Sequence, residues 1–161
     1  MPILTLHNLN KTLTSLRTQN KSIVLTGGCF DILHLGHIRF LEKAKKEGGI
    51  LLVMLESDEQ IRKLKGTGRP VHTQKERAEI LSSLRSIDYV LLLPGQMQNQ
   101  DYDLLVKKIK PAIIALTKGD STVEHKKRQA KLTGAKLRYV TPRIPDKSTS
   151  TIAQNLYKEK L

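Results

Sequence analysis

Two histidines that stand three residues apart are the side chains of this sequence best suited to chemistry. His34 and His37 close the stretch TGGCFDILHLGH, which begins at Thr26 at the end of an apolar run. Near the start of a helix, this spacing points both rings the same way. Each imidazole offers an N–H donor and titrates close to neutral pH. We interpret the pair as a site that binds negative charge, against the alternative of two surface histidines at a helix cap.

The residues around the pair favour a phosphate ligand. Gly27 and Gly28 allow a tight turn and a close approach of the backbone to a ligand. The helix that follows presents free N–H groups and the positive end of its dipole, which suits phosphate. A metal site is the weaker hypothesis, because no third histidine or cysteine lies nearby. We expect Asp31 to cap the turn.

Apolar strands alternate with helical patterns along the 161 residues, which predicts one domain with a leading helix in 1–20 and an α/β core over 21–161. Unbroken apolar runs are typical of strands buried on both faces of a parallel sheet. The predicted fold is an open, doubly wound sheet of about five parallel strands, with ligands at the carboxyl ends of the strands. Strands are expected at 22–28, 50–56, 89–93, 112–116 and 136–140, and helices at 4–18, 35–47, 73–85, 101–109, 122–132 and 148–158.

Composition narrows the class of protein and of partner. The net charge of +13 fits a nucleic-acid partner, small phosphorylated ligands, or simply a basic soluble protein. Cys29 is the only cysteine, so no intramolecular disulfide is possible and a reducing compartment is expected. The amino terminus lacks the layout of a signal peptide, and no apolar run reaches the ~20 residues that cross a bilayer. We therefore expect a cytoplasmic protein with no membrane partner.

Four motifs resemble, in order and spacing, those of the HxGH nucleotidyltransferases, a cytidylyltransferase-like family with a Rossmann-like fold. The nearest likeness is to the nucleotidyltransferase domain of bifunctional ADP-heptose synthases, followed by glycerol-3-phosphate cytidylyltransferase. The resemblance covers nearly the whole chain. Its motifs are GGCFDILHLGH, SDEQIRKLKGTGRPV (Ser57–Val71), ERAEILSSLRSIDYVLL (Glu76–Leu92) and RIPDKSTSTI (Arg143–Ile152).

The resemblance implies transfer of AMP or CMP from a nucleoside triphosphate to a small phosphorylated acceptor, such as a sugar or polyol phosphate, with release of pyrophosphate. It also implies Mg²⁺, held mainly by the triphosphate and water with few protein ligands and no protein metal site. Many members are dimers, so a homodimer is one expectation. The implied catalytic residues are His34, His37, Lys65 and Arg143, and the implied nucleotide-binding residues are Gly28, Cys29, Phe30, Asp120, Ser148, Thr149 and Ser150.

The sequence also departs from the family pattern, chiefly around the base and acceptor pockets. The second strand ends in MLESD, where the relatives usually have an asparagine before the serine, and TKGDS at 117–121 replaces KGGDY. These changes leave the acceptor and the choice of ATP or CTP open. The alternative hypothesis is a catalytically degenerate nucleotide- or RNA-binding protein on the same fold. The basic run HKKRQAK at 125–131 lacks interleaved aromatics, which argues against a nucleic-acid partner.

Two basic residues of the implied site keep a second interpretation. Arg69 lies in the same loop as Lys65 and is a further candidate phosphate ligand. Arg77 opens a predicted helix, where a structural ion pair is at least as good an explanation as a catalytic role.

Overall fold

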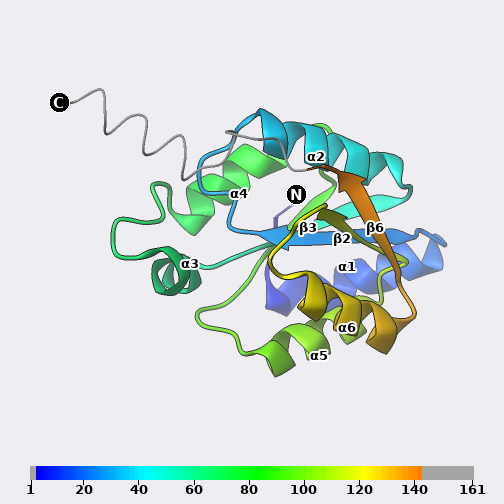
Figure 1. The fold of residues 1–161 in the computed structure, drawn as a ribbon. Coiled ribbons are helices and arrows are strands. Elements are labelled where there is room, and N and C mark those ends of the chain that lie inside the picture. The colour runs from blue at the N-terminus through cyan, green and yellow to red at the C-terminus, as the bar shows by residue number, and fades with distance from the viewer. Residues whose placement is uncertain (1–2, 143–161) are drawn as a thin grey trace.

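The computed structural model describes residues 3–142, in which helices and strands alternate (Figure 1). The strands are β1 (Ile3–Leu4), β2 (Ile23–Gly28), β3 (Ile50–Leu55), β4 (Tyr89–Leu92), β5 (Ile113–Thr117) and β6 (Lys136–Thr141). The helices are α1 (Leu6–Thr18), α2 (Leu35–Lys46), α3 (Asp58–Lys65), α4 (Gln74–Ser82), α5 (Asn99–Ile109) and α6 (Val123–Thr133).

All the strands pair in parallel, in the order β1-β4-β3-β2-β5-β6. From β2 the chain adds β3 and β4 on one side, and then returns to add β5 and β6 on the other. The order therefore reverses between β2 and β5, and ligands bind outside the carboxyl ends of the strands at such a point. The turn that follows β2 lies there, as the sequence predicted.

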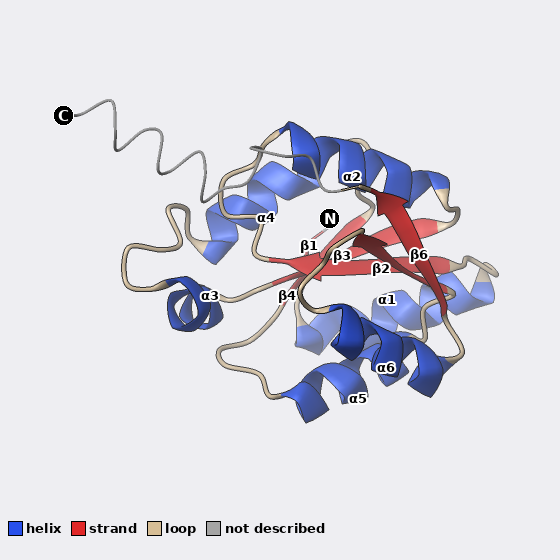
Figure 2. Ribbon diagram, viewed as in Figure 1, coloured by secondary structure: helices blue, strands red, loops and turns tan. Residues whose placement is uncertain are grey.

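Helices cover both faces of the sheet (Figure 2). α2 and α4 lie on one face, and α1, α5 and α6 lie on the other. Successive side chains of β3 alternate between the two hydrophobic clusters: Leu51 and Val53 pack beneath α2 and α4, whereas Leu52 and Met54 face α1 and α5. Burial on both faces is why β3 is an unbroken apolar run, and it confirms the doubly wound α/β fold.

The structure corrects the prediction at three places. The sheet has six strands instead of about five, because Ile3 and Leu4 pair with Val90 and Leu91 at one edge. The leading helix consequently begins at Leu6 and not at residue 4. Sequence analysis also missed α3, which buries only Ile61 and so has almost no apolar periodicity. The predicted helix over 148–158 lies outside the described residues.

Candidate functional site

The turn after β2 depends on a glycine and a folded-back aromatic ring. Phe30 has a φ of 44°, in the left-handed region that non-glycine residues rarely adopt. Its buried ring packs against Gly28, where an added Cβ would come within 3.1 Å of the ring. The same ring lies 5.2 Å from the ring of His37, measured between centroids. Gly28 and Phe30 thus shape the strand end and support one of the two histidines.

The two histidines lie together at the start of α2, as their spacing predicted. Their rings stack with centroids 3.8 Å apart and an angle of 24° between the ring planes. His34 is the N-cap residue, and its carbonyl accepts hydrogen bonds from the backbone N–H groups of His37 and Ile38. The Nδ1 atom of His34 is buried and has no hydrogen-bond partner within residues 3–142, whereas the His37 ring interacts with the Ile32 backbone. Buried polar atoms in proteins nearly always have partners, so this arrangement points to a ligand.

Both imidazoles are held in the neutral form. Burial, the nearby His34 and the charge of Lys65 lower the pKa of His37 to about 4, against the smaller effect of a hydrogen bond with the Ile32 backbone. Burial also lowers the pKa of His34. Two protonated rings in such contact would repel each other. An anion beside them would favour protonation, so the pair can both donate hydrogen bonds to phosphate and gain positive charge when phosphate binds.

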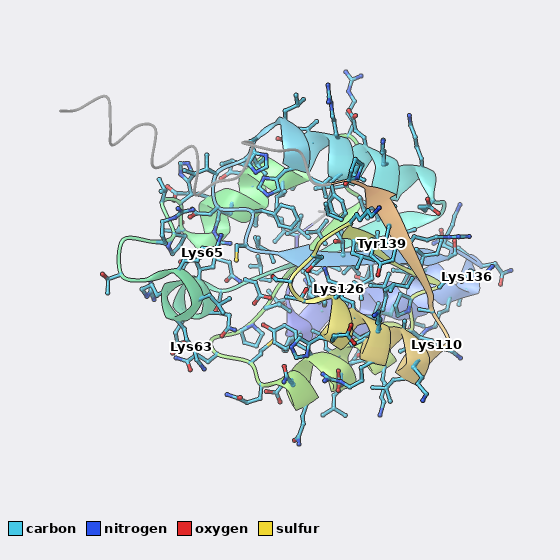
Figure 3. All side chains as sticks on the ribbon, viewed as in Figure 1. Lys63, Lys65, Lys110, Lys126, Lys136 and Tyr139 are labelled. Atoms are coloured by element: carbon cyan, nitrogen blue, oxygen red, sulfur yellow. The ribbon has the colours of Figure 1, made fainter. Side chains whose placement is uncertain are left out.

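Lys65 and Arg69 bring positive charge to the same turn. Lys65 ends α3 beside the carboxyl end of β2, whereas Lys110 and Lys136 lie at the opposite end of the sheet (Figure 3). Burial raises the pKa of the Cys29 thiol and the Lys65 charge opposes that shift, so Lys65 lies near both Cys29 and His37. Arg69 forms an ion pair with Asp31, and its Nη2 is buried without a partner within 3–142. Both cations therefore keep donors available to a ligand.

Asp31 has a different role from the predicted one. It does not cap its own turn: its carboxylate pairs with Arg69 and accepts a hydrogen bond from the backbone N–H of Val71 at 2.7 Å. These partners lie about forty positions along the chain, so sequence alone could not identify them. Asp31 thereby fixes the 69–71 segment against the histidine turn.

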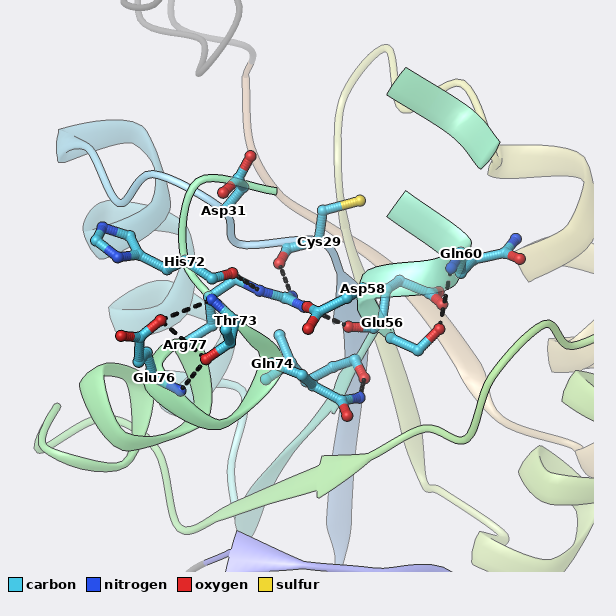
Figure 4. Close-up of polar contacts among 12 residues, drawn as sticks. Cys29, Asp31, Glu56, Asp58, Gln60, His72, Thr73, Gln74, Glu76 and Arg77 are labelled. Carbon is cyan, nitrogen blue, oxygen red and sulfur yellow. Dashed lines mark hydrogen bonds and ion pairs between the residues drawn. The ribbon is translucent and has the colours of Figure 1, made fainter. Parts of the chain in front are cut away.

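Arg77 is the structural support of the turn (Figure 4). The residue is 1% exposed, and its side chain donates to the carbonyls of Cys29 at 2.6 Å, Glu56 at 2.9 Å and His72 at 3.0 Å. It also forms an ion pair with Asp58 at 2.6 Å. The guanidinium therefore joins the ends of β2 and β3 to α3 and α4. Of the two interpretations of Arg77, these contacts support a structural ion pair over a catalytic role.

A cavity of about 330 Å³ lies on the opposite face of the same strand end, between α3, α5 and α6. Leu25, Met54 and Ile114 form its apolar wall, and Gly28 and Cys29 line its border with the turn. Its polar side chains include Glu56, Gln60, Tyr102, His125 and Lys126. The turn after β2 therefore separates the stacked histidines on one face from a cavity on the other.

A hydrogen bond between two side chains fixes the polar part of this cavity. The Tyr102 hydroxyl donates to Glu56 Oε2 at 2.7 Å. Burial raises the pKa of Glu56, although this hydrogen bond and the Arg77 charge act to lower it. Burial and the Glu56 charge raise the pKa of Tyr102. Neither Tyr102 nor Gln60 was predicted as a site residue, since Tyr102 fits an ordinary helical pattern and Gln60 lies on α3, which was not predicted. Glu56 was noted only as a departure from the family.

The carboxylate of Asp120, predicted to contact a ribose, already forms hydrogen bonds and an ion pair with neighbouring residues of the chain. Its carboxylate accepts hydrogen bonds from the N–H and hydroxyl of Thr122, at 2.8 and 2.6 Å, and pairs with Lys126. Burial acts to raise the pKa of Asp120, but the Lys126 charge and these hydrogen bonds lower it overall. Asp120 does not line the cavity, whereas its partners Thr122 and Lys126 do.

Three of the four lysine and arginine side chains of the basic helix α6 have acidic partners. Lys126 pairs with Asp120, Lys127 pairs with Glu124 at 2.8 Å, and Arg128 binds both carboxylate oxygens of Asp103. Three consecutive cations thus have partners, which weakens the case for an RNA-binding surface on α6. Arg143, Ser148, Thr149 and Ser150, the remaining predicted site residues, lie outside the described part of the chain.

Comparison with known proteins identifies the family. A sequence model of the family described as cytidylyltransferase-like matches residues 25–155. The chain belongs to the cytidylyltransferase-like family. It is therefore a nucleotidyltransferase by family, as the four motifs implied.

The cytidylyltransferase-like relatives include proteins named bifunctional protein HldE. The chain is 42% identical over 114 residues to that of Desulfatibacillum aliphaticivorans, which is 71% of this chain and 22% of the relative. It is also 42% identical over 112 residues to that of Aliarcobacter butzleri, which is 70% of this chain and 23% of the relative. The chain thus spans about a fifth of the length of these relatives.

Solved structures agree with the family fold. A lipopolysaccharide core biosynthesis protein from Thermoplasma volcanium is 30% identical, with a TM-score of 0.60 over 76% of this chain and 97% of that chain. The pantoate-beta-alanine ligase of Francisella tularensis, at 17% identity and a TM-score of 0.59 over 95% of this chain and 73% of that one, shares the fold alone. Among residues 3–142, no helix is both long enough and apolar enough to span a membrane.

Proposed function

We propose that this chain transfers AMP or CMP from a nucleoside triphosphate to a small phosphorylated acceptor, such as a sugar or polyol phosphate. The observation that carries the proposal is the neutral, stacked pair His34 and His37 at the start of α2. The relatives named HldE and the lipopolysaccharide core biosynthesis protein support an acceptor of the sugar phosphate class. With nucleoside triphosphates as donors and one cysteine, the expected compartment is the cytoplasm.

The reaction needs charge stabilisation more than acid–base catalysis. An oxygen of the acceptor phosphate attacks the α-phosphorus of the triphosphate, the bond from that phosphorus to the bridging oxygen breaks, and pyrophosphate leaves with the bonding electrons. A phosphate monoester is largely dianionic at pH 7, since its second pKa is about 6, so no general base is required. Donors held in place around the α-phosphate then provide most of the catalysis.

The described residues fit these tasks. His34 and His37 donate to the phosphates, and Lys65 and the free Nη2 of Arg69 add positive charge at the same turn. Arg143 and the hydroxyls of Ser148, Thr149 and Ser150 are proposed to complete the phosphate site from the carboxyl-terminal segment. Asp120 would reach a ribose hydroxyl only by giving up a hydrogen bond from Thr122 or its pairing with Lys126.

Magnesium is proposed to enter with the triphosphate. Within residues 3–142, no group of three or more His, Cys, Asp or Glu side chains has the arrangement of a metal site. Near the turn, the Asp31 carboxylate is committed to Arg69 and Val71. An ion held by the triphosphate and water would need few protein ligands. It would supply charge neutralisation on the phosphates.

The first experiment measures the melting temperature of the protein with Mg²⁺ and each of ATP, CTP, GTP and UTP. A nucleotide at 100 times its Kd should add about 2.7 kcal/mol to the free energy of unfolding. Pyrophosphate release with a panel of sugar and polyol phosphates then identifies the acceptor. A protein that no nucleotide stabilises, and that releases no pyrophosphate with any acceptor, would overturn the proposal.

A further inference from the structure

The cavity beside the turn presents hydrogen-bond acceptors to whatever enters it. Glu56 lines the cavity with one carboxylate oxygen, Oε2, already accepting from Tyr102. Gln60 lines it too, and its Oε1 is buried with no partner within the described residues. Both residues come from the β3–α3 junction, which Ser57 caps by accepting from the N–H of Gln60 at 3.0 Å. The part of the cavity that Glu56 and Gln60 line therefore suits a ligand rich in N–H or O–H donors.

The Glu56 carboxylate also gives this part of the cavity a negative charge. Among the ion pairs of residues 3–142, none includes Glu56. Arg77 donates to the backbone carbonyl of Glu56 and acts on its carboxylate only through its charge, and Lys126, the α6 lysine in the cavity wall, pairs with Asp120. In a chain of net charge +13, this is a local site that repels anions. A ligand with a second negative charge would be disfavoured there.

The cavity and the histidines share the Gly28–Cys29 strand end, which determines how an acceptor must lie. Its phosphate has to reach the nucleotide at the histidine turn. Its other end then extends into the cavity, whose volume of about 330 Å³ suits a small ligand. The groups that meet Glu56 are therefore those remote from the phosphate.

We propose that Glu56, positioned by Tyr102, is the residue that selects the acceptor. It accepts hydrogen bonds from hydroxyl groups at the end remote from the phosphate, and it excludes acceptors that carry a carboxylate or second phosphate there. This inference rests on the proposed nucleotidyl transfer and names the class of acceptor: an uncharged, hydroxylated carbon skeleton with one phosphate.

The test uses pairs of probes that differ in one group: glycerol 3-phosphate beside 3-phosphoglycerate, and glucose 1-phosphate beside glucuronic acid 1-phosphate. Cys29 is the only cysteine, lies half-buried and lines the cavity, so protection of its thiol from alkylation reports occupancy without any turnover. In the unaltered protein, the hydroxyl member of at least one pair should protect at a concentration about tenfold or more below that of its acid.

Three variants test which residue causes the preference for the hydroxyl probe over its acid. Glu56→Gln should reduce the ratio to about threefold or less, chiefly because the acid binds more tightly once the charge is gone. Tyr102→Phe, which frees the carboxylate but keeps the ring, should weaken binding of the hydroxyl member and retain discrimination against the acid. Glu59→Gln removes the same charge from an exposed position on α3 and should leave the ratio unchanged.

The outcomes separate this inference from the proposed function. If Glu56→Gln retains the full preference, or if no probe protects Cys29 while a nucleotide still raises the melting temperature, the assignment to Glu56 is wrong and nucleotidyl transfer stands. If Cys29 is protected but no nucleotide stabilises the protein and no pyrophosphate is released, the proposed function fails.

Discussion

The histidine turn and helix α6 are both rich in groups that could bind phosphate, but they differ in what those groups already contact. In α6, each of Lys126, Lys127 and Arg128 has an acidic partner. At the turn, neither His34 nor His37 forms an ion pair within residues 3–142, and the buried Nδ1 of His34 has no hydrogen-bond partner there. The abundance of basic residues is therefore a poor guide to the site. Side chains that lack an acidic partner and are held in place by the surrounding fold are a better one.

The largest effect should come from removing the support of the turn. Arg77→Met deletes the donor to three backbone carbonyls and breaks the ion pair with Asp58 at a position that is 1% exposed. Removing one partner of a buried pair typically costs about 3–5 kcal/mol. Chemical denaturation should show a loss in this range. Arg128→Met on α6, where the ion pair is partly exposed, should change the free energy of unfolding by about 0.5 kcal/mol or less.

Removing a functional nitrogen should affect catalysis and spare stability. His37→Ala should lower the rate of pyrophosphate release by more than about a hundredfold, the scale for losing a donor held ready for developing charge. The matched control is His7→Ala, an exposed histidine on α1, which should retain normal turnover. Steady-state assays at saturating nucleotide measure both. A fully active His37→Ala protein would show that the pair has no catalytic role.

The pH dependence of stability should reveal the same histidine. The pKa of His37 is about 4 in the folded chain. Since an unfolded histidine has a pKa of about 6.5, the unfolded state binds more protons between these values, and the free energy of unfolding must fall as pH drops. From pH 7 to pH 5 this contribution is about 1–2 kcal/mol. His37→Gln should therefore lose less stability than the unaltered protein over that range, as denaturation at each pH would show. Equal losses would mean that His37 titrates normally.

The sequence predicted those parts of the fold that follow from local pattern. Buried strands such as β3 are continuous apolar runs because both their faces are covered, and the helix expected from residue 73 is α4, which Thr73 caps by accepting from the N–H of Glu76. The two-residue strand β1 has no measurable period, and α3 buries one side chain. Ser57, followed by Asp58 and Glu59, was the signal that could have located α3.

The candidate site likewise contains contacts that follow from local spacing and contacts that only the packed fold creates. His34 and His37 are neighbours through their spacing, so their contact was predictable. The partners of Arg77, Asp31 and Glu56 come from segments far apart in the sequence, and only the packed fold brings them together. The ribose contact expected of Asp120 stays a prediction, since its carboxylate bonds to Thr122 and Lys126 of its own loop and helix.

The smallest effects should come from α6, and a matched pair of lysines tests the comparison most directly. Lys65→Gln and Lys127→Gln each remove one charge from an exposed side chain on a helix. Lys65 lies near enough to His37 and Cys29 to shift their pKa values, whereas Lys127 pairs with Glu124 within its own helix. Lys65→Gln should raise the KM for the nucleotide by about tenfold, which corresponds to about 1.4 kcal/mol. Lys127→Gln should change it by less than about twofold, because an exposed pair contributes little. Equal changes in KM for the two variants would mean that net charge, and not position at the turn, attracts the nucleotide, and salt dependence of the KM in both would confirm that alternative.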